Sequence, residues 1–174
     1  SAALAAVVCR LTVGKKQYAE VKDELSAVRD RADTLRAEPE TLIVKDEEAF
    51  GAVMAAFRLP KGTDEEQAER EAAVEAANKH AAEVPLTVMK TALEVLRLAC
   101  TVAAKGNQNS ITDAGVAGLM GMSAIEGAGY NVRINLTGLK DTSFATRMRD
   151  EVAAIVREGR KIADDIRGMV EAKL

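Results

Sequence analysis

The sequence is poor in aromatic residues, in cysteine and in long apolar runs. It has no tryptophan, two tyrosines and three phenylalanines among 174 residues, which excludes a core built on large aromatic rings. Its two cysteines, Cys9 and Cys100, match neither a zinc-ligand spacing nor a disulfide framework, so we expect a reducing, cytoplasmic compartment. No apolar run approaches the roughly 18 residues of a membrane span, and no segment resembles a signal peptide. We therefore expect no membrane partner.

The sequence also lacks an excess of charge of one sign. Its 24 basic side chains are interspersed with 27 acidic ones, for a formal net charge of −3, so no basic surface for nucleic acid is expected. There is a single histidine, and no group of cysteine, histidine or carboxylate residues has metal-ligand spacing. We therefore expect neither a nucleic-acid partner nor a metal site.

The chain is rich in small and aliphatic side chains that repeat at helical spacing. Apolar residues make up 48% of the sequence, and the length is that of one domain spanning residues 1–174. No strand pattern competes, because "RINLTG" and "TLIVK" are too short and isolated to build a sheet. The pattern predicts an all-α fold, a bundle of long antiparallel helices.

Prolines set the expected boundaries in the first half of the chain. Apolar residues within 18–35 repeat at intervals of three and four, which predicts an amphipathic helix. Pro39 is expected to start the next helix, which continues to Pro60. Pro85 is expected to kink or restart a helix, which leaves a central apolar helix over 86–104.

Capping signals and periodicity set the remaining boundaries. Thr63 and Glu66 have the spacing of a capping box, so a helix is expected to begin at Asp64. Two further helices are expected over 111–134 and 144–169. The last is nearly heptad-like, and such stripes are typical of surfaces buried against a second copy. We expect a two-fold symmetric homodimer.

The stretch "AAKGNQNSITDAGVAGLMG", residues 103–121, can be interpreted in two ways. In the structural interpretation, Ser110 caps a helix and Asp113 completes the capping box. In the functional one, Asp113 stands at the mouth of an unusually glycine-rich helix. Five glycines within 111–134 each cost about 1 kcal/mol relative to alanine. Close approach of another helix or of a flat ligand would offset that cost.

Two further polar sets are candidates for a site. Lys15, Lys16 and Tyr18 stand at a junction between two expected helices, where solvated lysines are the simpler interpretation. Asn131 and Asn135 are four positions apart and share one helical face.

Several blocks of the sequence, in order and over nearly the whole chain, resemble the cyclodeaminase/cyclohydrolase family. This family includes stand-alone methenyltetrahydrofolate cyclohydrolases and the cyclodeaminase domains of bifunctional enzymes. The blocks that carry the resemblance are "LTVGKKQYAEV", "DEEAFGAVMAAFRLPKGTDEEQ", "AAEVPL", "KGNQNSITDAGVA" and "NVRINL".

The resemblance implies an all-α dimer that acts on a tetrahydrofolate derivative as substrate and needs no cofactor. One departure is at the start of the chain, where family members usually carry a glycine-rich loop. We expect this loop to be missing here, with only Ser1 to mark its end. The positions that match the folate site of the family are Lys15, Lys16, Tyr18, Asn107, Asn109 and Asp113, with Asn131 and Asn135 as further polar candidates.

The chemistry implied by the resemblance takes place at the carbon that bridges two folate nitrogens. In the cyclohydrolase reaction water adds to the cationic carbon of 5,10-methenyltetrahydrofolate, and the adduct opens to 10-formyltetrahydrofolate. We expect Asp113 to act as the general base. Lys15 would steady the developing oxyanion, or it or Lys16 would bind the glutamate tail, while Asn107 and Asn109 would hold the pterin. In the alternative cyclodeaminase reaction, ammonia leaves from a formimino group.

One distance constrains this hypothesis. Asp113 and Asn131 are 18 positions apart, or about 27 Å along one straight helix. Both can touch one folate only if the helix breaks near Gly127 and Gly129 or if a second subunit supplies one of them. A competing hypothesis from another class is a non-catalytic helical interaction module, but it leaves the glycines of 111–134 unexplained.

Overall fold

The computed structural model describes residues 1–174 and contains helices and no strands. The all-α prediction is confirmed, and no helix is long and apolar enough to span a membrane. The elements in chain order are α1 (Ala2–Val13), the 3₁₀ helix η1 (Lys16–Val21), α2 (Lys22–Phe57), α3 (Asp64–Lys105), the 3₁₀ helix η2 (Gln108–Ser110), α4 (Ile111–Asn135) and α5 (Thr142–Glu171).

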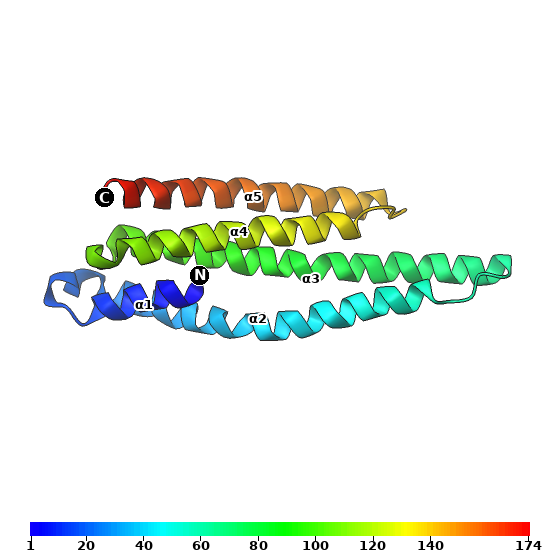
Figure 1. The fold of residues 1–174 in the computed structure, drawn as a ribbon, viewed down its shortest axis with the longest axis horizontal. Helices are drawn as coiled ribbons and strands as arrows, with labels where there is room; N and C mark the ends of the chain where they lie inside the picture. Colours follow the sequence, from blue (N-terminus) through cyan, green and yellow to red (C-terminus); the bar gives the residue numbers. More distant parts are fainter.

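The helices lie side by side along one axis and alternate in direction, as expected for an antiparallel bundle (Figure 1). α3 is the central helix and packs against α2, α4 and α5. The short α1 lies beside the first part of α2, so the N-terminus lies midway along the bundle near α4 (Figure 1). The segments that join α1 to α2 and α3 to α4 share one end of the bundle, together with the C-terminus (Figure 1).

Both expected breaks at proline are wrong. α2 continues without interruption through Pro39, and α3 runs from Asp64 to Lys105 through Pro85. A proline inside a helix leaves the carbonyl four residues earlier without its usual N–H donor. For Pro85 that carbonyl belongs to Ala81, and the side-chain amide of Asn135 on α4 donates to it at 2.9 Å. A side chain from the neighbouring helix thus satisfies the free carbonyl and lowers the cost of the proline.

The glycines of α4 are explained mainly by close packing of helices. A methyl group at Gly115 would lie 2.9 Å from Val170, and one at Gly118 would lie 3.1 Å from Ile166, both on α5. At Gly121 the nearest atom is 3.1 Å away, in Leu96 of α3. Gly127 differs, since a methyl group there would meet nothing within 4 Å. Packing within the chain therefore accounts for several of these glycines but not for Gly127.

Helix capping agrees with the sequence at one helix start and differs at another. The capping box between Thr63 and Glu66 is formed, with the helix beginning at Asp64 as predicted. Ser110 precedes α4, but its side chain makes no capping hydrogen bond, so the expected box with Asp113 is wrong. The residues before Ser110 instead form a short 3₁₀ turn, in which its N–H donates to a backbone carbonyl.

Ionic contacts hold the turn between α4 and α5 against α3. The carboxylate of Glu75 accepts hydrogen bonds from the backbone N–H groups of Lys140 and Asp141, which lowers the pKa of Glu75. The Lys79 ammonium lies 2.7 Å from the carboxylate of Asp141 and, through this hydrogen bond, lowers the pKa of Asp141 strongly. The position of the α4–α5 turn therefore depends on the charges of Glu75, Lys79 and Asp141, which can change with pH.

Candidate functional site

The turn between α3 and α4 docks tightly against the end of α1. The backbone N–H of Asn107 donates to the buried hydroxyl of Thr12 at 2.8 Å, and the Asn107 side chain reaches the carbonyl of Leu11 at 3.4 Å. A methyl group at Gly106 would lie 2.4 Å from the carbonyl oxygen of Val102, which explains the need for glycine there. Asn107 is thus a buried structural residue in this chain, and its oxygen also accepts from the N–H of residue 109.

Tyr18, which follows the two lysines, contacts the same turn. The hydroxyl of Tyr18 accepts a hydrogen bond from the backbone N–H of Gln108 at 3.4 Å. Lys15 and Lys16 are exposed next to it and form no ion pair, while Asn109 is exposed on the turn. Residues that are about 90 positions apart in the sequence therefore gather at one end of the bundle. We name this group, residues 15–18 together with 106–113, the polar turn.

Asp113 lies in the first turn of α4, at the edge of the polar turn. It is half-buried, and its carboxylate has no hydrogen-bond or ion-pair partner in the chain. Asp113 is therefore a carboxylate without a partner in the chain, and its role as the general base stays a prediction.

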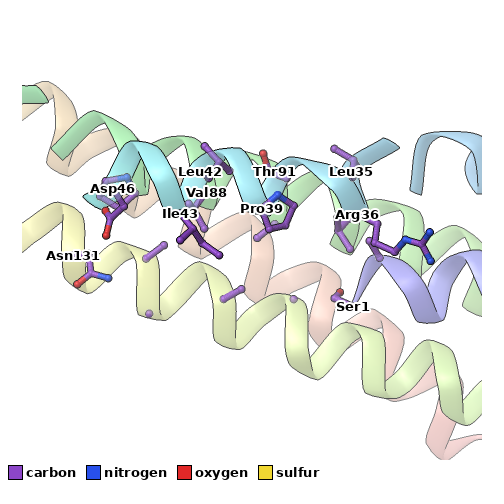
Figure 2. A pocket seen from close by; sticks show the side chains of 18 of the residues that line it. Ser1, Leu35, Arg36, Pro39, Leu42, Ile43, Asp46, Val88, Thr91 and Asn131 are labelled. Atoms are coloured by element: carbon purple, nitrogen blue, oxygen red, sulfur yellow. The ribbon is translucent and has the colours of Figure 1, made fainter. Parts of the chain in front are cut away.

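A groove of about 760 Å³ opens elsewhere, along the middle of the bundle between α2, α3 and α4 (Figure 2). Its volume is within the range of small-molecule sites. The floor on α4 is made of small residues, so a flat ring could lie close to the backbone. The main groove residues are Leu35, Arg36, Pro39, Leu42, Ile43 and Asp46 on α2, Val88, Thr91 and Val95 on α3, Gly121, Ala124, Gly127 and Asn131 on α4, and Ser1.

The two ends of the groove differ in charge. Figure 2 shows Arg36 and Ser1 at one end and Asp46 and Asn131 at the other, with apolar side chains between them. The hydroxyl of Ser1 is already bonded, since it donates to the carbonyl of Ala117 at 2.8 Å. Arg36 and Asp46 form no ion pair within the chain. The sequence analysis named Ser1 and Asn131 but missed the three charged residues of the groove, Arg36, Asp46 and Glu47.

The predicted site residues thus fall into two groups within one chain. The polar turn holds most of them, while Ser1 and Asn131 line the groove. Asn135 lies one turn beyond the groove, where it bonds to Ala81. Because α4 is unbroken from Ile111 to Asn135, a break near Gly127 is excluded as a way to unite Asp113 with Asn131.

Comparison with known proteins gives consistent matches over most of the chain. The family described as formiminotransferase-cyclodeaminase matches residues 1–154. The chain is 42% identical over 173 residues to the methenyltetrahydrofolate cyclohydrolase of Methylorubrum extorquens, covering 99% of this chain and 83% of that protein.

More distant relatives are larger or are known as structures. The formimidoyltransferase-cyclodeaminase of Rattus norvegicus is 28% identical over 172 residues, and the match spans 99% of this chain but only 32% of that protein. The crystal structure of formiminotetrahydrofolate cyclodeaminase from Thermotoga maritima superposes with a TM-score of 0.87 at 26% identity, covering 98% of this chain and 81% of that one.

Proposed function

Because this chain belongs to the formiminotransferase-cyclodeaminase family, we propose that it hydrolyses 5,10-methenyltetrahydrofolate to 10-formyltetrahydrofolate. The observation that carries this proposal is the 42% identity, over nearly its whole length, to a protein named for that reaction. Identity to the bifunctional cyclodeaminases is lower, at 28%, and the chain matches about a third of their length.

The reaction requires a base near the bridging carbon of the folate. Water adds to the cationic methenyl carbon and loses a proton, after which a carbon–nitrogen bond of the tetrahedral adduct breaks. We assign the proton transfer to Asp113, whose carboxylate has no partner in the chain. Lys15 would stabilise the oxygen that becomes negative. The folate itself carries the reactive carbon, so the proposed reaction uses no cofactor or metal.

The remaining residues of the polar turn would bind the substrate rather than react with it. Lys16 is exposed next to Lys15 and would contact the folate close to the reacting carbon. Asn109 is exposed and free to bond to the folate, and Tyr18 would fix the turn through its bond to Gln108. Asn107 would position this turn, because its backbone and side chain are both engaged with α1.

A cyclodeaminase activity is the second candidate. It is favoured by the TM-score of 0.87 with a formiminotetrahydrofolate cyclodeaminase. In that reaction a folate nitrogen attacks the formimino carbon and ammonia leaves after protonation, so the same acid and lysines would serve.

One experiment separates the two reactions. The purified protein is given 5,10-methenyltetrahydrofolate, and loss of the methenyl absorbance is followed; a parallel assay measures ammonia release from 5-formiminotetrahydrofolate. We expect rapid methenyl loss and little ammonia. Ammonia release without enzymatic methenyl hydrolysis would contradict the cyclohydrolase proposal in favour of the cyclodeaminase. Failure of both assays would contradict both enzymatic functions.

We also propose that the active form is a homodimer in which α4 of one copy packs on α4 of the other. The outward face of α4 carries large apolar side chains, each exposed by at least 46%, that nothing in the chain covers. Small residues lie between them, which allows two helices to approach closely. This face consists of Val116, Leu119, Met120, Ser123, Gly127, Tyr130 and Ile134.

The face is self-complementary in an antiparallel pairing with the two-fold axis level with Ile125. A two-fold interface places each residue opposite one that is equally far from the axis. Large residues then meet large ones and small residues meet near the crossing, where Gly127 has open space in the single chain. The pairs brought together are Val116 with Ile134, Met120 with Tyr130, and Ser123 with Gly127.

This pairing reduces the distance between the two groups of predicted site residues. Asp113 of one copy would lie opposite position 137 of the other, six residues from Asn131. The separation along the helix axis falls from about 27 Å within one chain to about 9 Å between copies. Each site would therefore combine the Asp113 of one copy with the groove of the other.

The dimer proposal is tested with Met120→Glu, a change at an exposed position that leaves the core intact. Burying an unpaired carboxylate against Tyr130 of the other copy should give a monomer by light scattering and lower turnover by about 100-fold or more, the scale of a lost general base. The matched control is Ala154→Glu, at an exposed position of α5, which should leave mass and turnover unchanged. A wild-type monomer with full activity would rule out the proposal.

A further inference from the structure

Asp46 occupies an unusual position on α2. The inward face of this helix repeats at intervals of three and four, and nearly every member of the repeat is apolar. Asp46 is its one charged residue. The repeat comprises Val28, Ala32, Leu35, Pro39, Leu42, Asp46, Ala49, Val53 and Ala56.

A charged side chain at a core-facing position costs stability unless it has a function or a partner. Asp46 has no ion-pair partner in the chain, and it remains exposed because the groove opens at this point. A leucine there would continue the face toward Ala49. The position therefore points to a ligand in the groove as the partner of this carboxylate.

Arg36 provides the complementary charge at the opposite end. It lines the groove, is exposed and forms no ion pair with the chain. Ten positions separate Arg36 from Asp46, or about 15 Å along α2. Between them lie Pro39, Leu42 and Ile43, which form an apolar wall. An elongated ligand with hydrogen-bond donors at one end, a flat apolar middle and an anion at the other would match this order.

We propose that the groove holds its folate in one orientation, with the pteridine at Asp46 and Asn131 and the glutamate at Arg36. The proposal rests on the proposed function for the identity of the ligand, and it adds Asp46 and Arg36 as residues that bind and orient it. The methenyl carbon, adjacent to the pteridine, then lies toward the Asn131 end of the groove. In the proposed dimer this is the end that Asp113 of the other copy approaches.

The chemistry of each end favours this orientation over the reverse. A pteridine presents an N–H and an amino group side by side, and a carboxylate accepts from both through charge-assisted hydrogen bonds. The side-chain amide of Asn131, opposite Asp46 in Figure 2, can donate to the adjacent carbonyl. The guanidinium of Arg36 suits the glutamate carboxylates. Reversal would place those carboxylates against Asp46, where like charges repel.

The test measures binding of two stable reduced ligands by calorimetry, 5-formyltetrahydrofolate and the matching 5-formyltetrahydropteroyl amide, in which a neutral carboxamide replaces the glutamate. Asp46→Asn should weaken both ligands by about 10-fold to 100-fold, the usual effect of losing a hydrogen bond to a charged group. Arg36→Gln should weaken the first ligand by a similar factor and leave the second unchanged. Lys45→Gln and Glu48→Gln, exposed on α2 outside the groove, serve as matched controls and should bind both ligands as the wild type does.

Two results would overturn the orientation. One is binding of both ligands by Asp46→Asn and Arg36→Gln as tightly as by the wild type. The other is the reverse pattern, in which the effect of Asp46→Asn, rather than that of Arg36→Gln, depends on the glutamate. Turnover of 5,10-methenyltetrahydrofolate is measured in parallel. A wild-type protein that binds in the predicted pattern but hydrolyses no substrate would contradict the proposed function and support the orientation.

Discussion

The polar turn and the groove use similar polar residue types in different ways. In the turn, Asn107 and Tyr18 are largely occupied by hydrogen bonds that hold α1 against the end of α3. In the groove, Asp46 and Arg36 have no ion-pair partner, and apolar side chains separate them. The backbone of the turn is therefore closely packed, with Lys15, Lys16 and Asp113 unpaired at its surface, whereas the groove combines unpaired charges with open volume.

The difference shows that a polar motif and a binding surface need not coincide within one chain. The polar turn would supply reactive groups, chiefly Asp113 and Lys15, from a rigid base. The groove would supply volume and orientation. The proposed pairing of α4 with its copy is the arrangement that would bring the two together.

The largest effect is expected from Asp113→Asn. If the turn supplies the base and the groove binds the ligand, turnover should fall by about 10²-fold to 10⁴-fold. Binding of 5-formyltetrahydrofolate should stay within about twofold of wild type. Loss of methenyl absorbance gives the rate, and calorimetry gives the binding constant.

Asp150→Asn is the matched control for this prediction, since Asp150 is exposed on α5 and has no ion-pair partner. It should turn over substrate at the wild-type rate. Full turnover by the Asp113→Asn protein would contradict the assignment of Asp113 as general base. The groove carboxylate Asp46 would then be the next candidate for that role.

An intermediate effect is expected from adding a methyl group to a glycine of each region. Gly106→Ala should destabilise the fold by about 1–3 kcal/mol, because the methyl would overlap the Val102 carbonyl and the Val8 side chain. In the Met120→Glu background, where the proposed α4 interface is absent, Gly127→Ala should stabilise the fold by up to about 1 kcal/mol, because the position is open within the chain and alanine favours helix. Urea unfolding at one fixed protein concentration gives both values, and equal signs would contradict the contrast between a filled turn and an open groove.

The smallest effect on stability is expected from lowering the pH, which should weaken the α4–α5 turn but not the polar turn. The pKa values of Asp141 and Glu75 in the α4–α5 turn are lowered in the folded protein. Their contribution to stability is therefore complete above the unfolded pKa values of about 3.9 and 4.3 and is lost as pH falls through the lower folded values. The bond from Asn107 to Thr12 has a neutral hydroxyl acceptor and does not titrate in this range.

Amide hydrogen exchange between pH 5 and pH 2 is the measurement for this last prediction. After correction for intrinsic rates, the amides of Lys140 and Asp141 should lose protection at a higher pH than the amide of Asn107. The opposite order would mean that the ionic contacts of the α4–α5 turn contribute little to its stability.

Much of the fold could be predicted because its signals are local. The capping box at Thr63 and the helical periodicity depend on neighbouring residues alone, and both are confirmed. The predictions at Pro39 and Pro85 were wrong because the cost of a proline inside a helix depends on the local sequence. The contact that offsets this cost can come from a distant part of the chain. For Pro85 the compensating donor, Asn135, is 50 positions away.

Prediction of the site was limited by the same error. Interpreting Pro39 as a helix start divides the inward face of α2 into two shorter patterns, and Asp46 then resembles any solvated acid. Only in the continuous helix from Lys22 to Phe57 does it stand within an apolar repeat. The grouping of Lys15 and Tyr18 with the α3–α4 turn came from the family resemblance, since no spacing rule joins segments 90 positions apart.

The bond between Asn135 and the carbonyl that Pro85 leaves free also locks the lengthwise register of α4 on α3. If α4 slid by one helical turn, about 5.4 Å, this carbonyl would lose its donor and become an unsatisfied polar group in the interior. Sliding is a low-energy motion for smooth helices in other bundles, but here it is opposed by a single amide. Residues of α4 therefore keep their lengthwise positions relative to residues of α3. A ligand bound between the two helices thus keeps the same contacts with both.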